Sequence, residues 1–187
     1  NLVLPHIVTG AVAYWPIRTR DKEWKVELDV EYVGWSANRN LDIRLENGVT
    51  ILQPQEWRDV AVIAVGTEYR WLNPIWLPHW EVAARTGYTY TGDPVPIHTF
   101  NPAMISLPAH TFSLGAGFLC KGAGRLLGVI PCSGASSWWP KGIGLDVAFQ
   151  EWFYEPRTIM GNLLSPTING TYQASVHLGS VGVQVLY

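Results

Sequence analysis

Two pairs of residues have types and spacings that could do chemistry. His79 and Glu81 lie two positions apart, so in a strand they would share a face and could offer a nitrogen and an oxygen to a metal ion. A tetrahedral site needs further ligands, and the sequence places none nearby. We therefore expect no metal site, and we expect ordinary loop or capping roles for the histidines.

Glu151 and Glu155 could form the pair of carboxylates that glycoside hydrolysis requires. Such a pair must stand about 5 to 10 Å apart, and nothing in the sequence brings these two side chains together. The glycine-rich run at residues 122–128 lacks the spacing and the βαβ context of a dinucleotide loop. No nucleophile elbow, zinc-binding helix or Walker loop occurs either. We therefore predict that the chain is not an enzyme and uses no cofactor.

Tryptophan is the most informative residue type in this chain, which contains ten of them. Tryptophan can stack on sugar rings, and it also anchors protein interfaces through its large area and single N–H donor. Because only 15% of the residues are charged, a protein interface is favoured over a sugar site. The candidate interface residues are the five in expected loops: Trp71, Trp76, Trp80, Trp138 and Trp139.

The two cysteines, Cys120 and Cys132, lie near the ends of a glycine-rich stretch at residues 109–133. Alternating apolar residues precede a hinge at residues 122–124, which predicts a buried hairpin or two successive core strands. The cysteines could form a disulfide if their strands are adjacent. Two buried free thiols are an equally good interpretation.

Charge is sparse and uneven along the chain. After Arg85 only eight side chains are charged, so either other subunits cover part of the surface or a thick two-sheet core carries a neutral surface. The net charge is −2 with no basic run, which excludes a basic arm for nucleic acid. No apolar run approaches the roughly 20 residues of a membrane span, so we expect a soluble or assembled protein. The first residue, Asn1, fits a removed signal peptide, a polyprotein cleavage or a trimmed chain.

These patterns predict an all-β fold in one domain, residues 1–187, with long loops and one or two short helices. Residues 25–33 alternate apolar and charged side chains, which predicts a strand with one buried and one solvated face. Residues 1–20 contain two prolines and are expected to be an extended arm or an edge strand. Residues 54–65 fit a short helix leading into a strand. Further strands are expected at residues 145–149, 172–178 and 181–187.

Strands separated by long loops with Pro and Trp, the few charges, the start without Met and the closing strand pair together resemble a small jelly-roll coat protein of picorna-like viruses. The resemblance implies an antiparallel jelly-roll β-sandwich that serves as a capsid subunit in a virion. Its partners would be copies of itself and other capsid subunits, with a host receptor or glycan as a further partner. The five loop tryptophans would then lie at subunit interfaces.

Two alternatives come from other functional classes. The same tryptophans and the single glycosylation sequon at Asn169 fit a secreted, lectin-like carbohydrate-binding β-sandwich. A β-sandwich glycoside hydrolase would use Glu151 and Glu155.

Overall fold

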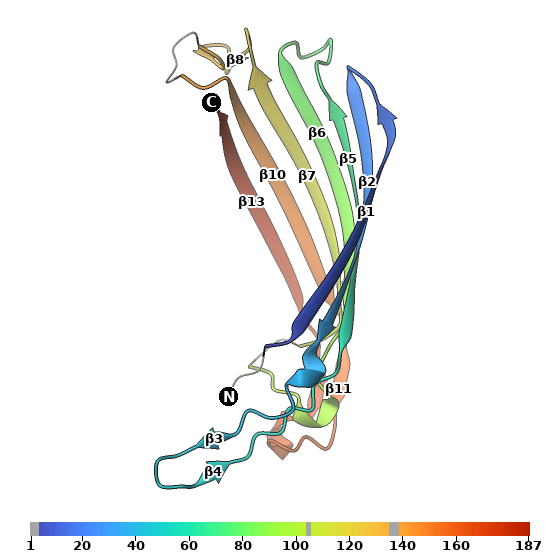
Figure 1. The fold of residues 1–187 in the computed structure, drawn as a ribbon, viewed down its shortest axis with the longest axis vertical. Coiled ribbons are helices and arrows are strands. Elements are labelled where there is room, and N and C mark those ends of the chain that lie inside the picture. Colours follow the sequence, from blue (N-terminus) through green and yellow to red (C-terminus); the bar gives the residue numbers. More distant parts are fainter. Residues whose placement is uncertain (1–3, 104–105, 135–138) are drawn as a thin grey trace.

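Seven long strands dominate the computed structural model, which describes residues 4–103, 106–134 and 139–187 (Figure 1). They are β1 (His6–Arg18), β2 (Lys22–Gly34), β5 (Val60–Trp71), β6 (Trp80–Thr91), β7 (Ala109–Lys121), β10 (Gly142–Tyr154) and β13 (Ser175–Leu186). The short strands are β3 (Ile43–Arg44), β4 (Thr50–Ile51), β8 (Arg125–Leu126), β9 (Ile130–Pro131), β11 (Arg157–Ile159) and β12 (Gly170–Tyr172). Three 3₁₀ turns complete the described chain: η1 (Trp35–Ala37), η2 (Ile97–Thr99) and η3 (Pro166–Ile168).

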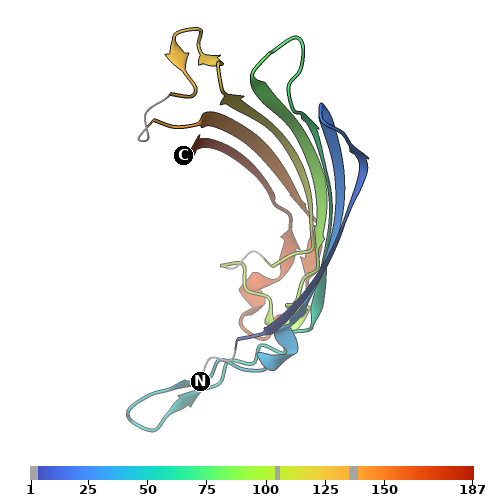
Figure 2. The ribbon, with the colours of Figure 1, turned by 45° about the horizontal axis from the view of Figure 1, so that its top comes forward.

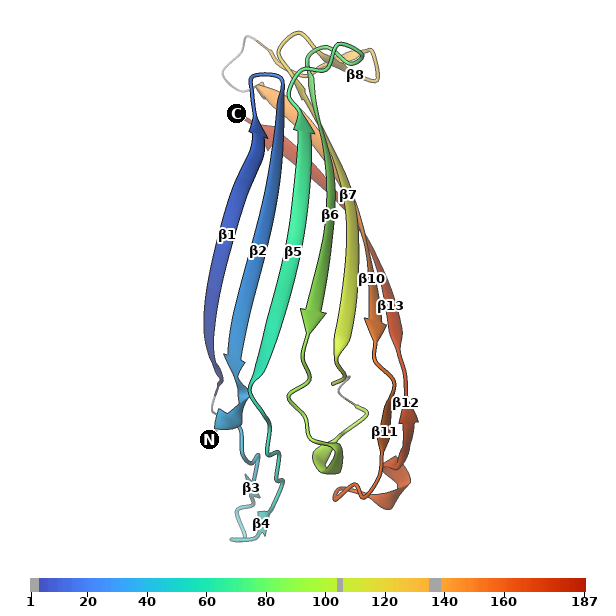
Figure 3. The ribbon, with the colours of Figure 1, turned by 90° about the vertical axis from the view of Figure 1, so that its right-hand side faces the viewer.

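The long strands form one antiparallel sheet in the order β1-β2-β5-β6-β7-β10-β13, so each strand lies beside the long strand before it in sequence (Figure 3). The predicted all-β antiparallel class is therefore confirmed. The predicted jelly-roll sandwich is wrong, because no second sheet packs on the first within the described residues. Alternation along a strand shows that one side is apolar, but it does not show what covers that side.

Two local expectations about helices are corrected by the structure, whereas the edge-strand interpretation of residues 1–20 agrees with it. Residues 54–59 form no helix, and β5 begins directly at Val60. The helices of the described residues are all 3₁₀ turns of three residues. Most of the segment expected to be an arm or an edge strand becomes β1, the edge strand of the sheet, with a register shift between Tyr14 and Ile17 around Pro16.

The sheet is strongly curved, and its seven strands follow an open arc (Figure 2). Its edge strands, β1 and β13, each have one side without a partner strand among the described residues. No helix in the described part of the chain is long and apolar enough to cross a membrane.

The connections lie at two ends of the sheet, which differ in construction. We call one the hairpin end, residues 18–23, 72–79, 121–134 and 139–141; it is uppermost in Figure 1. We call the other the cap end, residues 35–59, 92–103, 106–108 and 155–174. The buried apolar core of the molecule lies at the cap end, around Phe100 and Ile159, with exposed fractions of 2% and 0%. Asn162 joins these loops, because its Nδ2 donates to the carbonyl of Phe100 at 2.7 Å.

Candidate functional site

Strand register assigns every side chain of the sheet to one of two faces, because neighbours paired across strands share a face. In β2, Lys25 lies on the face of its partner Glu68, and Trp24 lies on the face of its partner Tyr69. The first of these faces is concave, since most residues that line a hollow of about 630 Å³ inside the arc (Figure 2), from β2 through to β13, belong to it. The other face is therefore convex.

The convex face carries an apolar band to which six of the seven long strands, all except β6, contribute exposed aliphatic side chains. Its members are large and open to the surroundings: the exposed fraction is 70% for Val12, 62% for Leu114 and 72% for Val183. A patch of this extent marks a surface that meets something other than water. The band also includes Val8, Leu28, Val30, Ile63, Val65, Leu145, Val147, Val181 and Val185.

Aromatic side chains border this band at both ends. At the hairpin end the rings of Tyr69 and Trp71 lie 4.7 Å apart, and the indole of Trp24 donates to Thr67 Oγ1 at 2.7 Å. At the cap end the rings of Tyr88 and Phe112 lie 5.2 Å apart. An aromatic ring beside an apolar surface places its polar tip in a wetter layer. The convex face thus passes from an aromatic border through an aliphatic band to a second aromatic border.

The concave face carries ion pairs between strands instead. Arg70 on β5 contacts Glu81 on β6 at 2.9 Å, and Lys121 on β7 contacts the same carboxylate at 2.5 Å. Arg70 also lies 3.6 Å from Glu23 on β2. Side chains from four adjacent strands are therefore linked across the concave wall.

A second link passes over a strand that contributes no side chain to it. Arg85 on β6 donates to Glu68 on β5 at 2.5 Å and to Asp146 on β10 at 2.7 Å, although β7 lies between β6 and β10. A Cβ atom on Gly117 of β7 would stand only 2.6 Å from Asp146 Oδ1 and 3.0 Å from Arg85 Nη1. The missing side chain of Gly117 is what leaves room for the bridge.

Charged and small residues of the concave face both line the hollow. The charged ones are Lys25, Glu27, Asp29, Glu68, Arg85 and Asp146. The small ones are Ala64, Gly66, Gly87, Ser113, Gly115, Ala148, Ser180 and Gly182. These small side chains occupy little of the space inside the arc.

The five candidate tryptophans do not form one site. Trp71 ends β5 and Trp80 begins β6, and both lie on the convex face in the aromatic border of the hairpin end. Trp76 lies in the connecting loop with an exposed fraction of 65%. Trp138 lies outside the described residues. That they act as interface residues remains a prediction.

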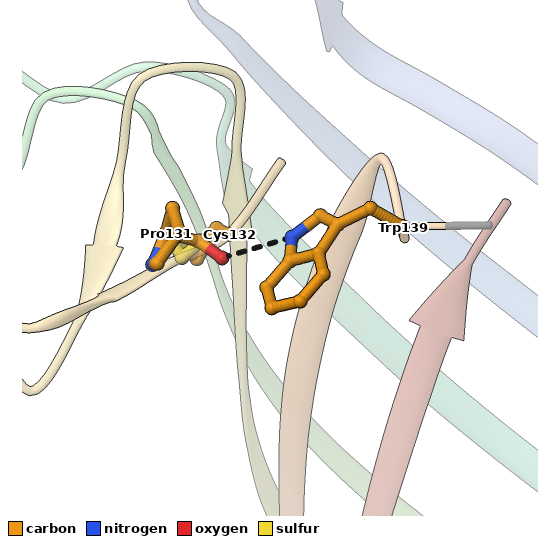
Figure 4. Close-up of a disulfide and its surroundings, with 4 residues drawn as sticks. Pro131, Cys132 and Trp139 are labelled. Carbon is orange, nitrogen blue, oxygen red and sulfur yellow. Dashed lines mark hydrogen bonds between the residues drawn. A yellow bond between two sulfur atoms is a disulfide. The ribbon is translucent and has the colours of Figure 1, made fainter. Parts of the chain in front are cut away.

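The structure joins Cys120 and Cys132 in a disulfide, with a Cα–Cα distance of 5.6 Å (Figure 4). Both residues are fully buried. Trp139 lies beside this bond, and its indole N–H donates to the carbonyl of Pro131 at 3.3 Å. The disulfide fixes the loop that carries β8 and β9 to the end of β7.

The polar pairs considered for chemistry have other partners. Glu81 is held by Arg70 and Lys121, and no group of three or more metal-ligating side chains occurs among the described residues. Glu151 pairs with His177, whereas Glu155 lies 3.0 Å from His110. The two glutamates are thus each engaged with a different histidine.

Sequence reasoning missed the convex face as a whole. Trp24, Val26, Leu28, Val30 and Tyr32 form a strand pattern with an aromatic residue at each end of an aliphatic run. This pattern is typical of a transmembrane β-strand, but each segment gives a much weaker signal than an apolar helix. Its charged alternate positions have the same pattern as a face in water, but they lie on the concave wall.

Comparison with known proteins points to one family. Residues 1–123 match the model of the family described as outer membrane protein transport protein (OMPP1/FadL/TodX). The crystal structure of a Pseudomonas aeruginosa FadL homologue shares the fold, with a TM-score of 0.60 and 16% sequence identity. That match covers 94% of this chain and 34% of the homologue, so the chain spans about a third of its length. No curated protein matches the chain.

The family match overturns the coat-protein resemblance and what it implied. A virion location, capsid partners and shell assembly are wrong, and so are the lectin and glycoside hydrolase alternatives. The expectation of no membrane span is also wrong, because strands that alternate in polarity cross a bilayer without any long apolar run. The prediction that the chain is not an enzyme is confirmed, since the family is one of transport proteins.

Proposed function

Because the chain belongs to the outer membrane protein transport protein family (OMPP1/FadL/TodX), we propose that its curved sheet is one section of the wall of a transmembrane β-barrel. The barrel transports hydrophobic compounds across an outer membrane. Further strands pair with the free edges of β1 and β13, because an open sheet edge is not tolerated in the hydrocarbon region.

The lengths of the strands support this proposal. A strand that crosses a bilayer at a tilt of about 45° needs about 9 to 11 residues. Each of the seven long strands has 12 or 13 residues, so each can cross the hydrocarbon core and still reach the headgroup layer.

The single observation that carries the proposal is the layering of the convex face. Outer-membrane barrels present an apolar band to lipid, with a girdle of aromatic residues at each membrane interface. Here Leu114 and Val183 belong to the aliphatic band, Trp24 and Trp71 to one aromatic border, and Tyr88 to the other. In water this band would carry a large cost for exposed apolar area, whereas in lipid it carries none.

The concave face supports a role as the inner wall of the barrel. Barrel interiors are polar, and interior residues alternate with lipid-facing residues along every strand. The ion pairs of Arg70 and Arg85 lie on this wall, and the hollow of about 630 Å³ leaves space on the inside.

A spin-label scan of the protein in lipid vesicles tests the membrane placement. Single cysteines are introduced at the neighbouring pairs Ser113/Leu114 and Ala148/Val147, which leaves the native disulfide intact. Labels at Leu114 and Val147 should be accessible to oxygen dissolved in the bilayer. Labels at Ser113 and Ala148 should be accessible to a polar nickel complex. Equal accessibility to both reagents at all four positions would refute the proposed membrane placement.

An uptake assay tests the proposed transport. The protein is expressed in bacterial cells that take up toluene slowly, and the initial rate of uptake of labelled toluene is compared with that of cells carrying an equal amount of an unrelated barrel. We expect faster uptake of toluene and unchanged uptake of a polar sugar. Equal toluene rates in the two strains would refute the transport of this class of compound.

A further inference from the structure

The two ends of the sheet differ in charge. The hairpin end carries six cations and two acids, a net charge of +4; they are Arg18, Arg20, Lys22, Lys121, Arg125 and Lys141 against Asp21 and Glu23. The cap end carries four cations and six acids, a net charge of −2; they are Arg39, Arg44, Arg58 and Arg157 against Asp42, Glu46, Glu56, Asp59, Asp93 and Glu155. The two ends therefore suit surroundings of opposite charge.

Lys22 stands where the convex face meets the hairpin end. It is the register partner of Trp71 and lies two residues before Trp24, so its side chain belongs to the convex face just beyond the aromatic border. Lys22 and Arg20 are exposed, and neither forms an ion pair with any of the described residues.

The turn that holds these two cations is fixed by hydrogen bonds. The N–H of Thr19 donates to the carbonyl of Lys22 at 2.9 Å, and the N–H of Lys22 donates to Thr19 Oγ1 at 3.2 Å. The nearest acids do not neutralise the pair completely. Glu23 lies on the concave face near Arg18 and Arg70, which leaves Asp21 as the single acid between two exposed cations.

The cap end has a different rim on the same face. On the convex face toward the cap end, Glu151 of β10 and His177 of β13 pair with each other. His110 bridges Tyr88 and Glu155 through its two ring nitrogens, at 2.7 and 3.0 Å. This rim therefore presents histidines and carboxylates where the hairpin end presents unpaired cations.

We propose that Arg20 and Lys22, next to Trp71, bind the phosphate of an anionic lipid headgroup in the leaflet that surrounds the hairpin end. This inference rests on the proposed membrane function. Aromatic belts lie at headgroup level, and long cationic side chains reach outward from there toward phosphate. Each Lys or Arg close to an anionic membrane surface increases the binding constant for that surface by about fivefold.

Lipid photocrosslinking tests the site. Benzoylphenylalanine replaces Trp71 next to the proposed site. As a matched control it replaces Tyr90, which lies on the convex face toward the cap end as the register partner of His110. The protein is reconstituted in vesicles with equal amounts of phosphatidylglycerol and phosphatidylcholine, and the adducts are counted by mass spectrometry. The quantity compared is the ratio of phosphatidylglycerol adducts to phosphatidylcholine adducts. We expect this ratio to be well above one at position 71 and near one at position 90.

Substitution of the two cations identifies the groups that bind. In the Arg20→Gln/Lys22→Gln variant the lipid ratio at position 71 should fall about tenfold or more, since two cations are removed. The Arg39→Gln/Arg44→Gln variant at the cap end should leave that ratio unchanged. A ratio near one at position 71 in the original protein, or a ratio insensitive to the loss of Arg20 and Lys22, would overturn the inference. Absence of any lipid adduct at position 71 would instead refute the membrane placement.

Discussion

Replacement of Gly117 by alanine should disconnect the ion pair that passes over β7. The new Cβ atom would lie 2.6 Å from Asp146 Oδ1, so the carboxylate must move away from Arg85. Gly115, two residues earlier on the same face, is the matched control. A Cβ atom there would make only ordinary contacts, the closest at 3.5 Å to the carbonyl oxygen of Val147.

The magnitude follows from two opposing effects. An alanine that fits a strand without strain stabilises by about 0.4 to 1 kcal/mol, because it restricts the unfolded chain, and this gain applies at both positions. Side-chain exposed fractions of 43% for Arg85 and Asp146 limit the ion pair between them to about 1 kcal/mol. Gly115→Ala should therefore be slightly stabilising, and Gly117→Ala should be about 1 kcal/mol less stable than Gly115→Ala.

Urea unfolding in lipid vesicles, followed by tryptophan fluorescence, measures these differences. The decisive comparison repeats both substitutions in an Asp146→Ala background, in which the carboxylate that obstructs the new methyl group is absent. The difference between Gly115→Ala and Gly117→Ala should disappear there. If the difference persists, or if the two variants are equally stable in the original background, the proposed role of Gly117 is incorrect.

Four further predictions concern other parts of the molecule. Val147→Arg on the convex face should destabilise the protein in vesicles by about 2 to 4 kcal/mol, whereas Ala148→Arg on the concave face should cost less than about 1 kcal/mol in the same urea titration. Reduction of the Cys120–Cys132 disulfide should lower the unfolding free energy by about 2 to 3 kcal/mol, and Cys120→Ser/Cys132→Ser should remove the effect of the reductant. Asn162→Ala should lower the unfolding free energy by about 2 to 3 kcal/mol, because the Asn162 side chain forms hydrogen bonds with Phe100, Leu164 and Ser165. It should also raise the rate of amide hydrogen exchange in residues 162–165, and an unchanged rate would contradict this role. Hydrogen bonds from the Tyr32 hydroxyl and the Ser36 N–H lower the pKa of Asp59 below its ordinary value of 3.8. The stabilising contribution of the Asp59 carboxylate is therefore present above pH 3.8 and is lost as the pH falls through the lowered pKa. In an acid titration, the unfolding free energy of Tyr32→Phe should depend less steeply on pH in this range than that of the original protein.

Part of the strand pattern could be predicted from the sequence, although residues 172–178 and 181–187, expected as two strands, contribute mostly to the single strand β13. Residues 25–33 alternate strictly, and they lie within β2. The curvature and the single layer could not be predicted in the same way, because alternation is the same whether an apolar face meets a second sheet or lipid. The acidic positions of β2 were misleading for this reason: an inner wall of a barrel and a face in water have the same sequence pattern.

The candidate site was predictable in part. Trp71 and Trp80 were predicted to be interface residues in loops, whereas they end β5 and begin β6. The aromatic border around Trp71 depends on Tyr69 and on its register partner Trp24. The bridge from Arg85 to Asp146 joins residues 61 positions apart. It depends on the absence of one side chain from an intervening strand, and no local pattern reveals such an absence.

The order of strands in the sheet has a consequence for how the protein forms. Each long strand pairs with the long strand before it in sequence, so no pairing has to wait for the chain to return from a distant region. Such local pairing keeps the contact order low and reduces the loop entropy lost at each step. The sheet can thus grow by one hairpin at a time from either edge. Gain or loss of a hairpin during evolution would change the circumference of the wall without altering the pairing of the strands that remain.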